Sequence, residues 1–99
     1  MEQIVRDSGH ADRLKIIYME TPANPTNDLI DIACCKAIAK RFSTDNNNVL
    51  VAVDNTYFGP LWQHPLKHGA DIVIYSATKY IGGHRDVIAG AVLVSSGII

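Results

Sequence analysis

Two nearly unbroken apolar runs constrain the fold of this chain more than any other feature of its sequence. They occupy residues 49–53 (VLVAV) and 71–75 (DIVIY). Runs this apolar and this rich in β-branched residues suit strands that are buried on both faces, as in a parallel sheet covered by helices. A similar run at residues 15–20 (KIIYME) precedes them and also predicts a strand.

The segment between the first two predicted strands has the pattern of a helix. Apolar residues recur at helical spacing from Leu29 to Ile38, and basic residues gather towards the end, where the helix dipole favours cations. Thr26 or Asn27 can cap this helix. The stretch before it, residues 21–25 (TPANP), contains two prolines, which exclude a helix and predict a rigid, extended loop.

The rest of the chain continues the alternation of strands and helices. Residues 43–48 form a polar segment that we expect to be a surface insertion, and residues 60–68 predict a short helical segment with Gly69 as its C-cap. Residues 88–94 (IAGAVLV) predict a last strand. This order predicts an α/β fold with a mostly parallel open sheet and flanking helices.

Composition and charge argue against several classes of function. Hydrophobic residues make up 47% of the chain and charged residues 19%, which is typical of a globular protein. The net charge of −1 gives no reason to expect nucleic acid or an anionic membrane as a partner. No stretch is long and apolar enough to span a bilayer, and residues 1–9 lack the pattern of a signal peptide. The two cysteines, Cys34 and Cys35, are adjacent and form no disulfide framework, so we expect a reducing, cytoplasmic setting.

Polar residues follow each of the first three predicted strands. In open α/β sheets, ligands bind beyond the carboxyl ends of the strands. We therefore expect an acid, an amide, several hydroxyls and an amine to meet at one rim. The three clusters are Glu20 to Asn24, Asp54 to Thr56, and Ser76 to Lys79.

Lys79 brings the most reactive group to this rim. A lysine in a partly apolar site loses some of its protonation, and a neutral amine attacks aldehydes to form a Schiff base. Pyridoxal 5′-phosphate requires such an amine and a carboxylate facing its ring nitrogen, for which Asp54 is suitably placed. Ser76 and Thr78 flank the lysine and can donate to a phosphate. Each residue alone is ordinary for a surface or a strand end, so only the combination favours a cofactor site.

Longer motifs carry a family resemblance over about three quarters of the chain. The segment from Tyr18 to about Val94 resembles the cofactor core of the Cys/Met-metabolism family of pyridoxal-phosphate enzymes, which carry out transsulfuration and related reactions. The run SATKYIGGH is highly specific. The matching stretches are ETPANPTNDLIDI (20–32), VAVDNTYFGP (51–60), PLKHGADIVIYSATKYIGGH (65–84) and AGAVLV (89–94).

The resemblance implies a role for each polar residue of the rim. Lys79 would form the Schiff base with the cofactor and move protons on the substrate. Asp54 would pair with the pyridine nitrogen, and Thr56 would lie near the ring and support that contact.

The same resemblance implies the remaining cofactor contacts and the type of fold. Ser76 and Thr78 would contribute to the phosphate site, Asn24 would face the phenolic oxygen of the ring, and Glu20 would lie nearby. The fold would be the large domain of the aspartate-aminotransferase type (fold type I), with residues 88–94 as its antiparallel strand.

The resemblance also implies that residues 1–99 form only part of this cofactor-binding domain. Family enzymes are much longer, and the groups that complete their phosphate and substrate-carboxylate sites have no counterpart here. We therefore expect the fragment alone to be inactive and the parent enzyme to be a homo-oligomer that acts on a small sulfur amino acid. Carbon–sulfur elimination of the methionine γ-lyase kind fits best. Cystathionine γ-synthase, cystathionine γ-lyase, O-acetylhomoserine sulfhydrylase and a non-catalytic truncated relative are the alternatives.

Three other functions are weaker explanations of the sequence. Tyr75 and Lys79 have the Y-x-x-x-K spacing of short-chain dehydrogenases, but Tyr75 ends a predicted strand and no G-x-G-x-x-G is present. Asp54 ends a strand as in nucleotide triphosphatases, but no phosphate-binding loop accompanies it. His64 and His68 are four residues apart, yet a proline intervenes and a third ligand is lacking, so we expect no metal site.

Overall fold

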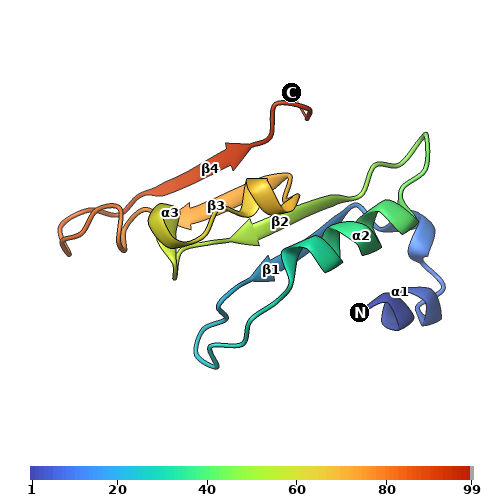
Figure 1. The fold of residues 1–99 in the computed structure, drawn as a ribbon, viewed down its shortest axis with the longest axis horizontal. Coiled ribbons are helices and arrows are strands. Elements are labelled where there is room, and N and C mark those ends of the chain that lie inside the picture. The colour runs from blue at the N-terminus through green and yellow to red at the C-terminus, as the bar shows by residue number, and fades with distance from the viewer. Residues whose placement is uncertain (99) are drawn as a thin grey trace.

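An open four-stranded sheet organises the computed structural model, which describes residues 1–98 (Figure 1). Its strands lie in the order β1-β2-β3-β4; β1 pairs with β2 and β2 with β3 in parallel, whereas β3 and β4 are antiparallel. This confirms the predicted α/β fold with a mostly parallel sheet and an antiparallel last strand. The strands are β1 (Ile16–Glu20), β2 (Leu50–Asp54), β3 (Ile72–Ser76) and β4 (Gly90–Val94).

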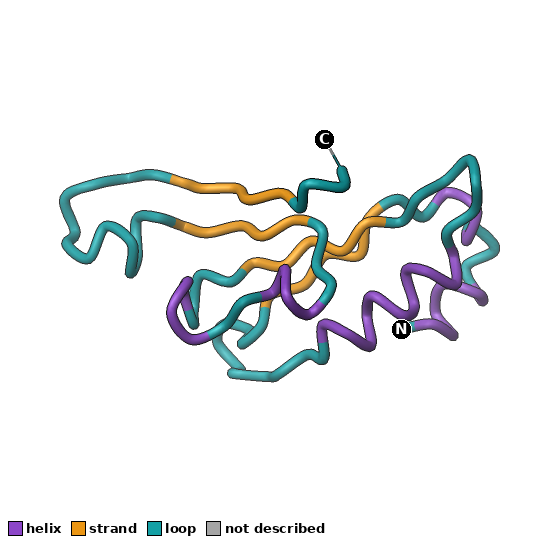
Figure 2. Tube along the Cα trace, turned by 45° about the horizontal axis from the view of Figure 1, so that its top comes forward, coloured by secondary structure: helices purple, strands orange, loops and turns teal. Residues whose placement is uncertain are grey.

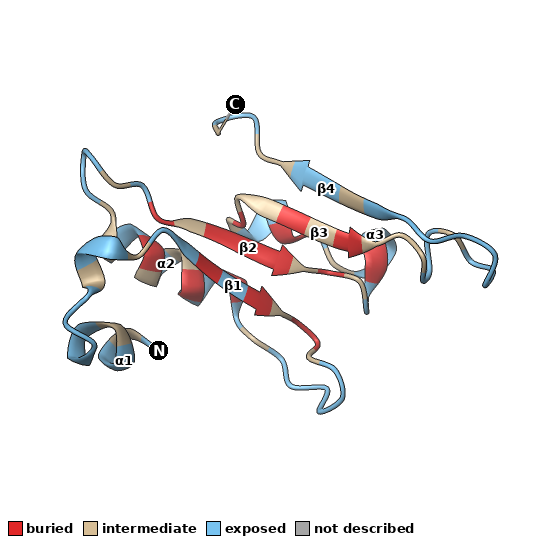
Figure 3. Cartoon of the chain, turned by 180° about the vertical axis from the view of Figure 1, so that it is seen from behind, coloured by how far each residue is buried: buried red, intermediate tan, exposed pale blue. Residues whose placement is uncertain are grey.

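Helices cover one face of this sheet. In Figure 2, α2, α3 and the turn η2 lie together below the strands, and the view from behind in Figure 3 leaves the opposite face of the sheet uncovered. No helix within residues 1–98 has the length and apolarity needed to cross a membrane. The helices are α1 (Glu2–Asp7), α2 (Ile32–Phe42) and α3 (Gly59–Trp62), with short 3-10 turns at η1 (Ala11–Arg13) and η2 (Pro65–His68).

Helix α2 begins later than the sequence pattern predicts. Its N-cap is Asp31, whose Oδ1 accepts a hydrogen bond from the Cys34 N–H at 2.9 Å. The predicted caps were wrong because they belong to a turn ahead of the helix. Thr26 donates its hydroxyl to Asp28 at 2.6 Å, and Asn27 has a positive φ of 60°, which no α-helix accommodates.

Alternate strand residues face α2 and form the core. Their side chains are at most 6% exposed, which is typical of a well-packed interior. The core residues on the sheet are Ile17, Met19, Val51, Val53 and Val73, and their partners on α2 are Ile32, Cys35 and Ala39.

Burial on the other face departs from the prediction. Burial alternates along β3, and Ile16, Tyr18 and Val92 are 51%, 59% and 63% exposed. The prediction of burial on both faces is confirmed for the run at residues 49–53, where Val51, Ala52 and Val53 are all buried, but it was wrong for the run at residues 71–75, whose second face is only half-buried. The physical reason is that α2, α3 and η2 all lie on the same face of the sheet.

Single residues fix two of the connections between helices and strands. Gly69 ends η2 with a φ of 94°, the left-handed conformation predicted for a glycine C-cap. The polar segment at residues 43–48 is tied to the start of the sheet by Asn47, whose Nδ2 donates to the backbone oxygens of Asp12 and Leu14 at 3.2 and 3.0 Å. This segment therefore lies largely at the surface, as predicted, and Asn47 anchors it to the residues before β1.

Candidate cofactor site

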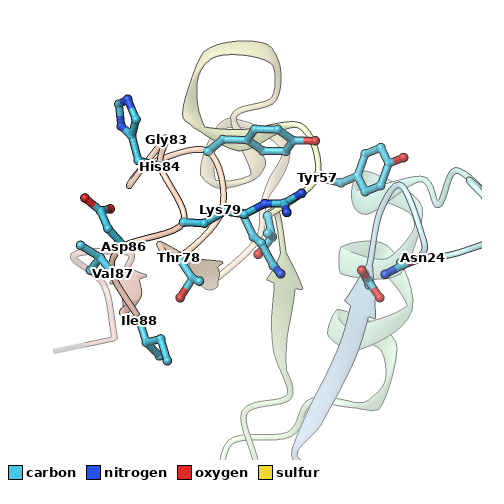
Figure 4. A pocket seen from close by; sticks show the side chains of 13 residues that line it. Asn24, Tyr57, Thr78, Lys79, Gly83, His84, Asp86, Val87 and Ile88 are labelled. Carbon is cyan, nitrogen blue, oxygen red and sulfur yellow. The ribbon is translucent and has the colours of Figure 1, made fainter.

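The carboxyl ends of β1, β2 and β3 lie at one edge of the sheet, and a cavity of about 830 Å³ opens there (Figure 4). This volume is in the range of small-molecule sites. Five of the residues predicted from the sequence line the cavity. They are Glu20 at the end of β1, Asn24 in the loop that follows it, Thr56 after β2, and Thr78 and Lys79 after β3.

Asp54 and Ser76 lie beside the cavity but are not among its lining residues. They end β2 and β3 and are half-buried. The Thr56 N–H donates to Asp54 Oδ1 at 3.0 Å, and the Thr56 hydroxyl oxygen accepts from the Ser76 N–H at 2.7 Å. Thr56 thus joins both strand ends to the wall of the cavity.

The second carboxylate oxygen of Asp54 is only weakly engaged. Asp54 Oδ2 lies 3.4 Å from the Tyr18 hydroxyl, which is long for a hydrogen bond between oxygens. Partial burial raises the pKa of Tyr18, and the negative charges of Asp54 and Glu20 raise it further. Asp54 therefore offers one oxygen that the backbone orients and a second that can bind a cationic group.

Lys79 lies across the cavity from Asn24 in Figure 4. The backbone fixes its position, because the Lys79 N–H donates to the Ser76 carbonyl at 3.1 Å and the Lys79 carbonyl accepts from the Gly83 N–H at 2.9 Å. Its side chain is exposed, and its Nζ has no hydrogen-bond or ion-pair partner within residues 1–98. Tyr57, Tyr80, Val87 and Ile88 line the same cavity, so its wall is partly apolar, as expected from the sequence, although the Lys79 side chain remains exposed.

The two predicted phosphate ligands differ in availability. The Thr78 hydroxyl donates to the Ala89 carbonyl at 3.1 Å, and its oxygen accepts from the Ala89 N–H at 3.0 Å. This double contact fixes the entry to β4. The Ser76 Oγ has no hydrogen-bond partner within residues 1–98, so its proton is available to a ligand.

Several lining residues were not predicted from the sequence. Tyr57 and Tyr80 each follow a predicted site residue directly, and this adjacency was the available signal. His84, Arg85 and Asp86 add charged and polar groups from the connection between β3 and β4. Among the described residues, no three His, Cys, Asp or Glu side chains are grouped as metal ligands would be.

Comparison with known proteins places this chain in a family. Residues 4–98 match the family described as Cys/Met metabolism PLP-dependent enzyme. The chain is 53% identical over 81 residues to cystathionine beta-lyase MetC of Staphylococcus haemolyticus, covering 82% of this chain and 19% of that protein. It is 48% identical over 84 residues to L-methionine gamma-lyase of Pseudomonas deceptionensis, covering 85% and 20% of the two.

Solved structures agree with these matches. Cystathionine gamma-lyase from Lactobacillus plantarum, complexed with L-serine, superposes with a TM-score of 0.76 at 42% identity, over 85% of this chain and 21% of that one. Cystathionine gamma synthase from Xanthomonas oryzae pv. oryzae gives a TM-score of 0.80 at 35% identity, over 96% and 23%. The chain thus spans about a fifth of the length of the relatives it matches. Since the family match covers almost every residue and the sheet has the same arrangement, the chain belongs to the Cys/Met metabolism family of PLP-dependent enzymes.

Proposed function

We propose that this chain forms part of the cofactor-binding large domain of a lyase that cleaves carbon–sulfur bonds in amino acids, and that Lys79 attaches pyridoxal phosphate. The observation that carries this proposal is that Lys79, Thr56 and Asn24 line one cavity at the ends of three strands. The donor set fits the group. It offers an amine for the aldehyde, a carboxylate for the ring nitrogen, an amide for the phenolic oxygen and hydroxyls for the phosphate.

Lys79 and Asp54 would perform the chemical roles. When bound, pyridoxal phosphate withdraws the electron pair that is left on the α-carbon of the substrate. The exposed Nζ of Lys79 is free to bind the cofactor covalently and then to accept and return a proton at that carbon. Asp54, oriented by the Thr56 N–H at 3.0 Å, would hold the proton on the ring nitrogen.

The remaining residues would bind and orient. Ser76 has a hydroxyl proton to donate to the phosphate, and Thr78 would contribute by releasing the Ala89 carbonyl. Asn24 would donate its amide to the phenolic oxygen from the opposite wall of the cavity (Figure 4), which Glu20 also lines. Hydrogen bonds to both sides of the ring would fix its plane against Lys79.

For the whole protein, we propose elimination of the sulfur group from methionine-like substrates. Four of the relatives, all L-methionine gamma-lyases, are 48% to 54% identical to this chain, which supports this choice. Cleavage of cystathionine is the second candidate, supported by the 53% identity to a cystathionine beta-lyase. The two are distinguished by whether L-methionine or L-cystathionine yields an α-keto acid.

Borohydride trapping tests the attachment. The purified chain is mixed with pyridoxal phosphate, its visible absorbance is recorded, and reduction is followed by mass mapping of the modified peptide. We expect the label on Lys79, loss of that label in Lys79→Ala, and normal labelling of Lys79 in the matched surface control Lys67→Ala. A label spread evenly over surface lysines, or none at all, would refute the assignment.

A turnover assay tests the expectation that the chain alone is inactive. In the described residues, Lys79 is open to water, and competing hydration weakens the electrostatic contacts on which catalysis relies. We therefore expect no α-keto acid from L-methionine or L-cystathionine with the cofactor present. Release above the level of Lys79→Ala would contradict this expectation.

A further inference from the structure

A buried amide follows Asp54 at the end of β2. Asn55 is 0% exposed, and its Nδ2 lies 3.0 Å from the backbone oxygens of Gly59 and Gln63 and from the Tyr75 hydroxyl. Its Oδ1 accepts from Gln63 Nε2 at 2.8 Å. Both polar atoms are therefore satisfied, and a fully satisfied buried amide fixes one arrangement of its neighbours.

Gln63 extends this network from β2 to the loop that follows β1. The same Nε2 donates to the Thr21 carbonyl at 2.9 Å. Thr21 is 1% exposed, and its hydroxyl oxygen accepts from the Ile30 N–H at 3.0 Å. Gln63 therefore holds the base of the loop on which Asn24 lies, and Thr21 closes that loop at its far end.

Other links between this loop and the end of β2 are weak. The Thr21 N–H donates to the Asp54 carbonyl at 3.4 Å, beyond the usual range for such bonds. Asn24 itself is exposed, and the loop around it is held by its own bonds, such as that from the Ala23 N–H to the Asp28 carbonyl at 3.0 Å. Beyond the ladder that pairs Glu20 with Asp54, the Gln63 amide thus makes the shortest described hydrogen bond that links this loop to the end of β2.

We propose that Asn55 and Gln63 are positioning residues that hold Asn24 and Asp54 at the separation required by one cofactor ring. The inference rests on the proposed function, and it concerns two side chains that do not line the cavity. A ligand that contacts two loops at once needs their spacing fixed to about 0.5 Å. Gln63 would provide this spacing through the Thr21 carbonyl and the Asn55 side chain.

Two variants of Gln63 remove the link while sparing the core. Gln63→Met keeps the length of the side chain but cannot donate, so it loses the contacts to Thr21 and Asn55. Gln63→Asn keeps the amide, but its side chain is one methylene too short to reach both the Thr21 carbonyl and Asn55 Oδ1. It replaces Gln63→Met in the test if that variant folds poorly. The matched control is Lys67→Met, on the neighbouring turn η2, where the side chain is exposed.

The first measurement is hydrogen exchange without cofactor. We expect the amides of Ala23 and Ile30 to exchange about tenfold faster in both Gln63 variants, since the hydrogen bond from Gln63 to the Thr21 carbonyl, which supports this loop, is of ordinary strength. Exchange at the core residues Val51 and Val53 should stay unchanged, as should the whole pattern in Lys67→Met. Unchanged exchange at Ala23 and Ile30 would overturn the positioning role whether or not the chain binds cofactor.

The second measurement uses pyridoxal phosphate itself. In the Gln63 variants, we expect the concentration for half-labelling of Lys79 to rise about tenfold and the visible circular dichroism of the bound cofactor to fall. A loosened loop with unchanged labelling and dichroism would overturn the inference while leaving the proposed function intact. Absence of labelling at Lys79 in the unaltered chain would instead refute the proposed function, and the exchange result alone would then decide whether Gln63 positions the loop.

Discussion

Replacing Asp71 with alanine should destabilise this chain more than any other single change of a charged residue. Asp71 accepts from Lys36 Nζ with both carboxylate oxygens, at 2.7 and 2.6 Å, and its Oδ2 also accepts from the Val51 N–H at 2.8 Å. The side chains of Lys36 and Asp71 are 21% and 13% exposed, so the pair is partly buried. One carboxylate thus connects α2 to β2 and to the start of β3.

The expected magnitude follows from these contacts. Leaving the Val51 N–H without a partner costs about 1–3 kcal/mol. Breaking a fully buried ion pair costs about 3–5 kcal/mol, whereas a surface pair contributes about 0.2–1 kcal/mol, so the partly buried pair with Lys36 should contribute about 1–2 kcal/mol. We expect Asp71→Ala to cost about 2–5 kcal/mol in total. Asp71→Asn should cost about 1–2 kcal/mol, because its amide oxygen can keep the Val51 contact.

Urea unfolding of the single variants and of the double variant Lys36→Met/Asp71→Asn provides the test. If the pair is coupled, the double variant should lose about 1 kcal/mol less than the sum of the two single changes. Additive losses would refute the ion-pair argument. Equal costs for Asp71→Asn and Asp71→Ala would refute the role assigned to the Val51 contact.

Three further predictions concern single side chains. Burial raises the pKa of the Cys35 thiol, whereas Cys34 is exposed. Iodoacetamide at pH 8 should therefore alkylate Cys34 before Cys35 in a time course followed by peptide mass. Equal alkylation rates would contradict the burial of Cys35. Asp54→Asn removes a negative charge that raises the pKa of Tyr18 and should therefore lower that pKa in an NMR titration above pH 9; no change would mean that the two side chains are apart. Gly69→Ala should cost about 1–2 kcal/mol in urea unfolding, because Gly69 has a φ of 94° and an added Cβ would lie 3.1 Å from a side-chain carbon of α2.

The strands could be predicted from the sequence because each apolar run ends at a polar cluster. β2, predicted at residues 49–53, spans Leu50–Asp54, and β3 is displaced by one residue in the same way. Helix starts are less predictable because neighbouring polar residues compete for the cap. Asp31 is the N-cap in place of Thr26 or Asn27, because the hydroxyl of Thr26 donates to the Asp28 carboxylate within the turn before the helix. Helix α1 was not predicted, as it buries no residue and is held to α2 by the 2.6 Å ion pair between Glu2 and Arg41.

The candidate site could be predicted only as far as strand ends determine it. Sequence order alone brought Asn24, Thr56 and Lys79 to one rim. Sequence order could not tell which of two adjacent residues faces the cavity. In the structure, Asn55 is buried whereas Thr56 lines the cavity. Gln63 had no signal in the sequence at all. It directly follows the short helix α3, and it binds a backbone oxygen 42 residues away, which no local pattern encodes.

The error about β3 shows what an apolar pattern measures. In an antiparallel sheet with one solvent-exposed face, apolar and polar residues alternate along each strand. A strand that is covered on both faces does not show this alternation. Ile16, Tyr18 and Val92 lie on the face that no described helix covers and are more than half exposed, yet they are apolar or aromatic, as residues of a covered face would be. Each such side chain would be stabilised by about 1.5–3 kcal/mol on full burial. An apolar strand pattern therefore shows which faces of a strand favour burial, but not which other elements bury them. For this reason the sequence predicted the strands but overestimated how many of their side chains are buried within residues 1–98.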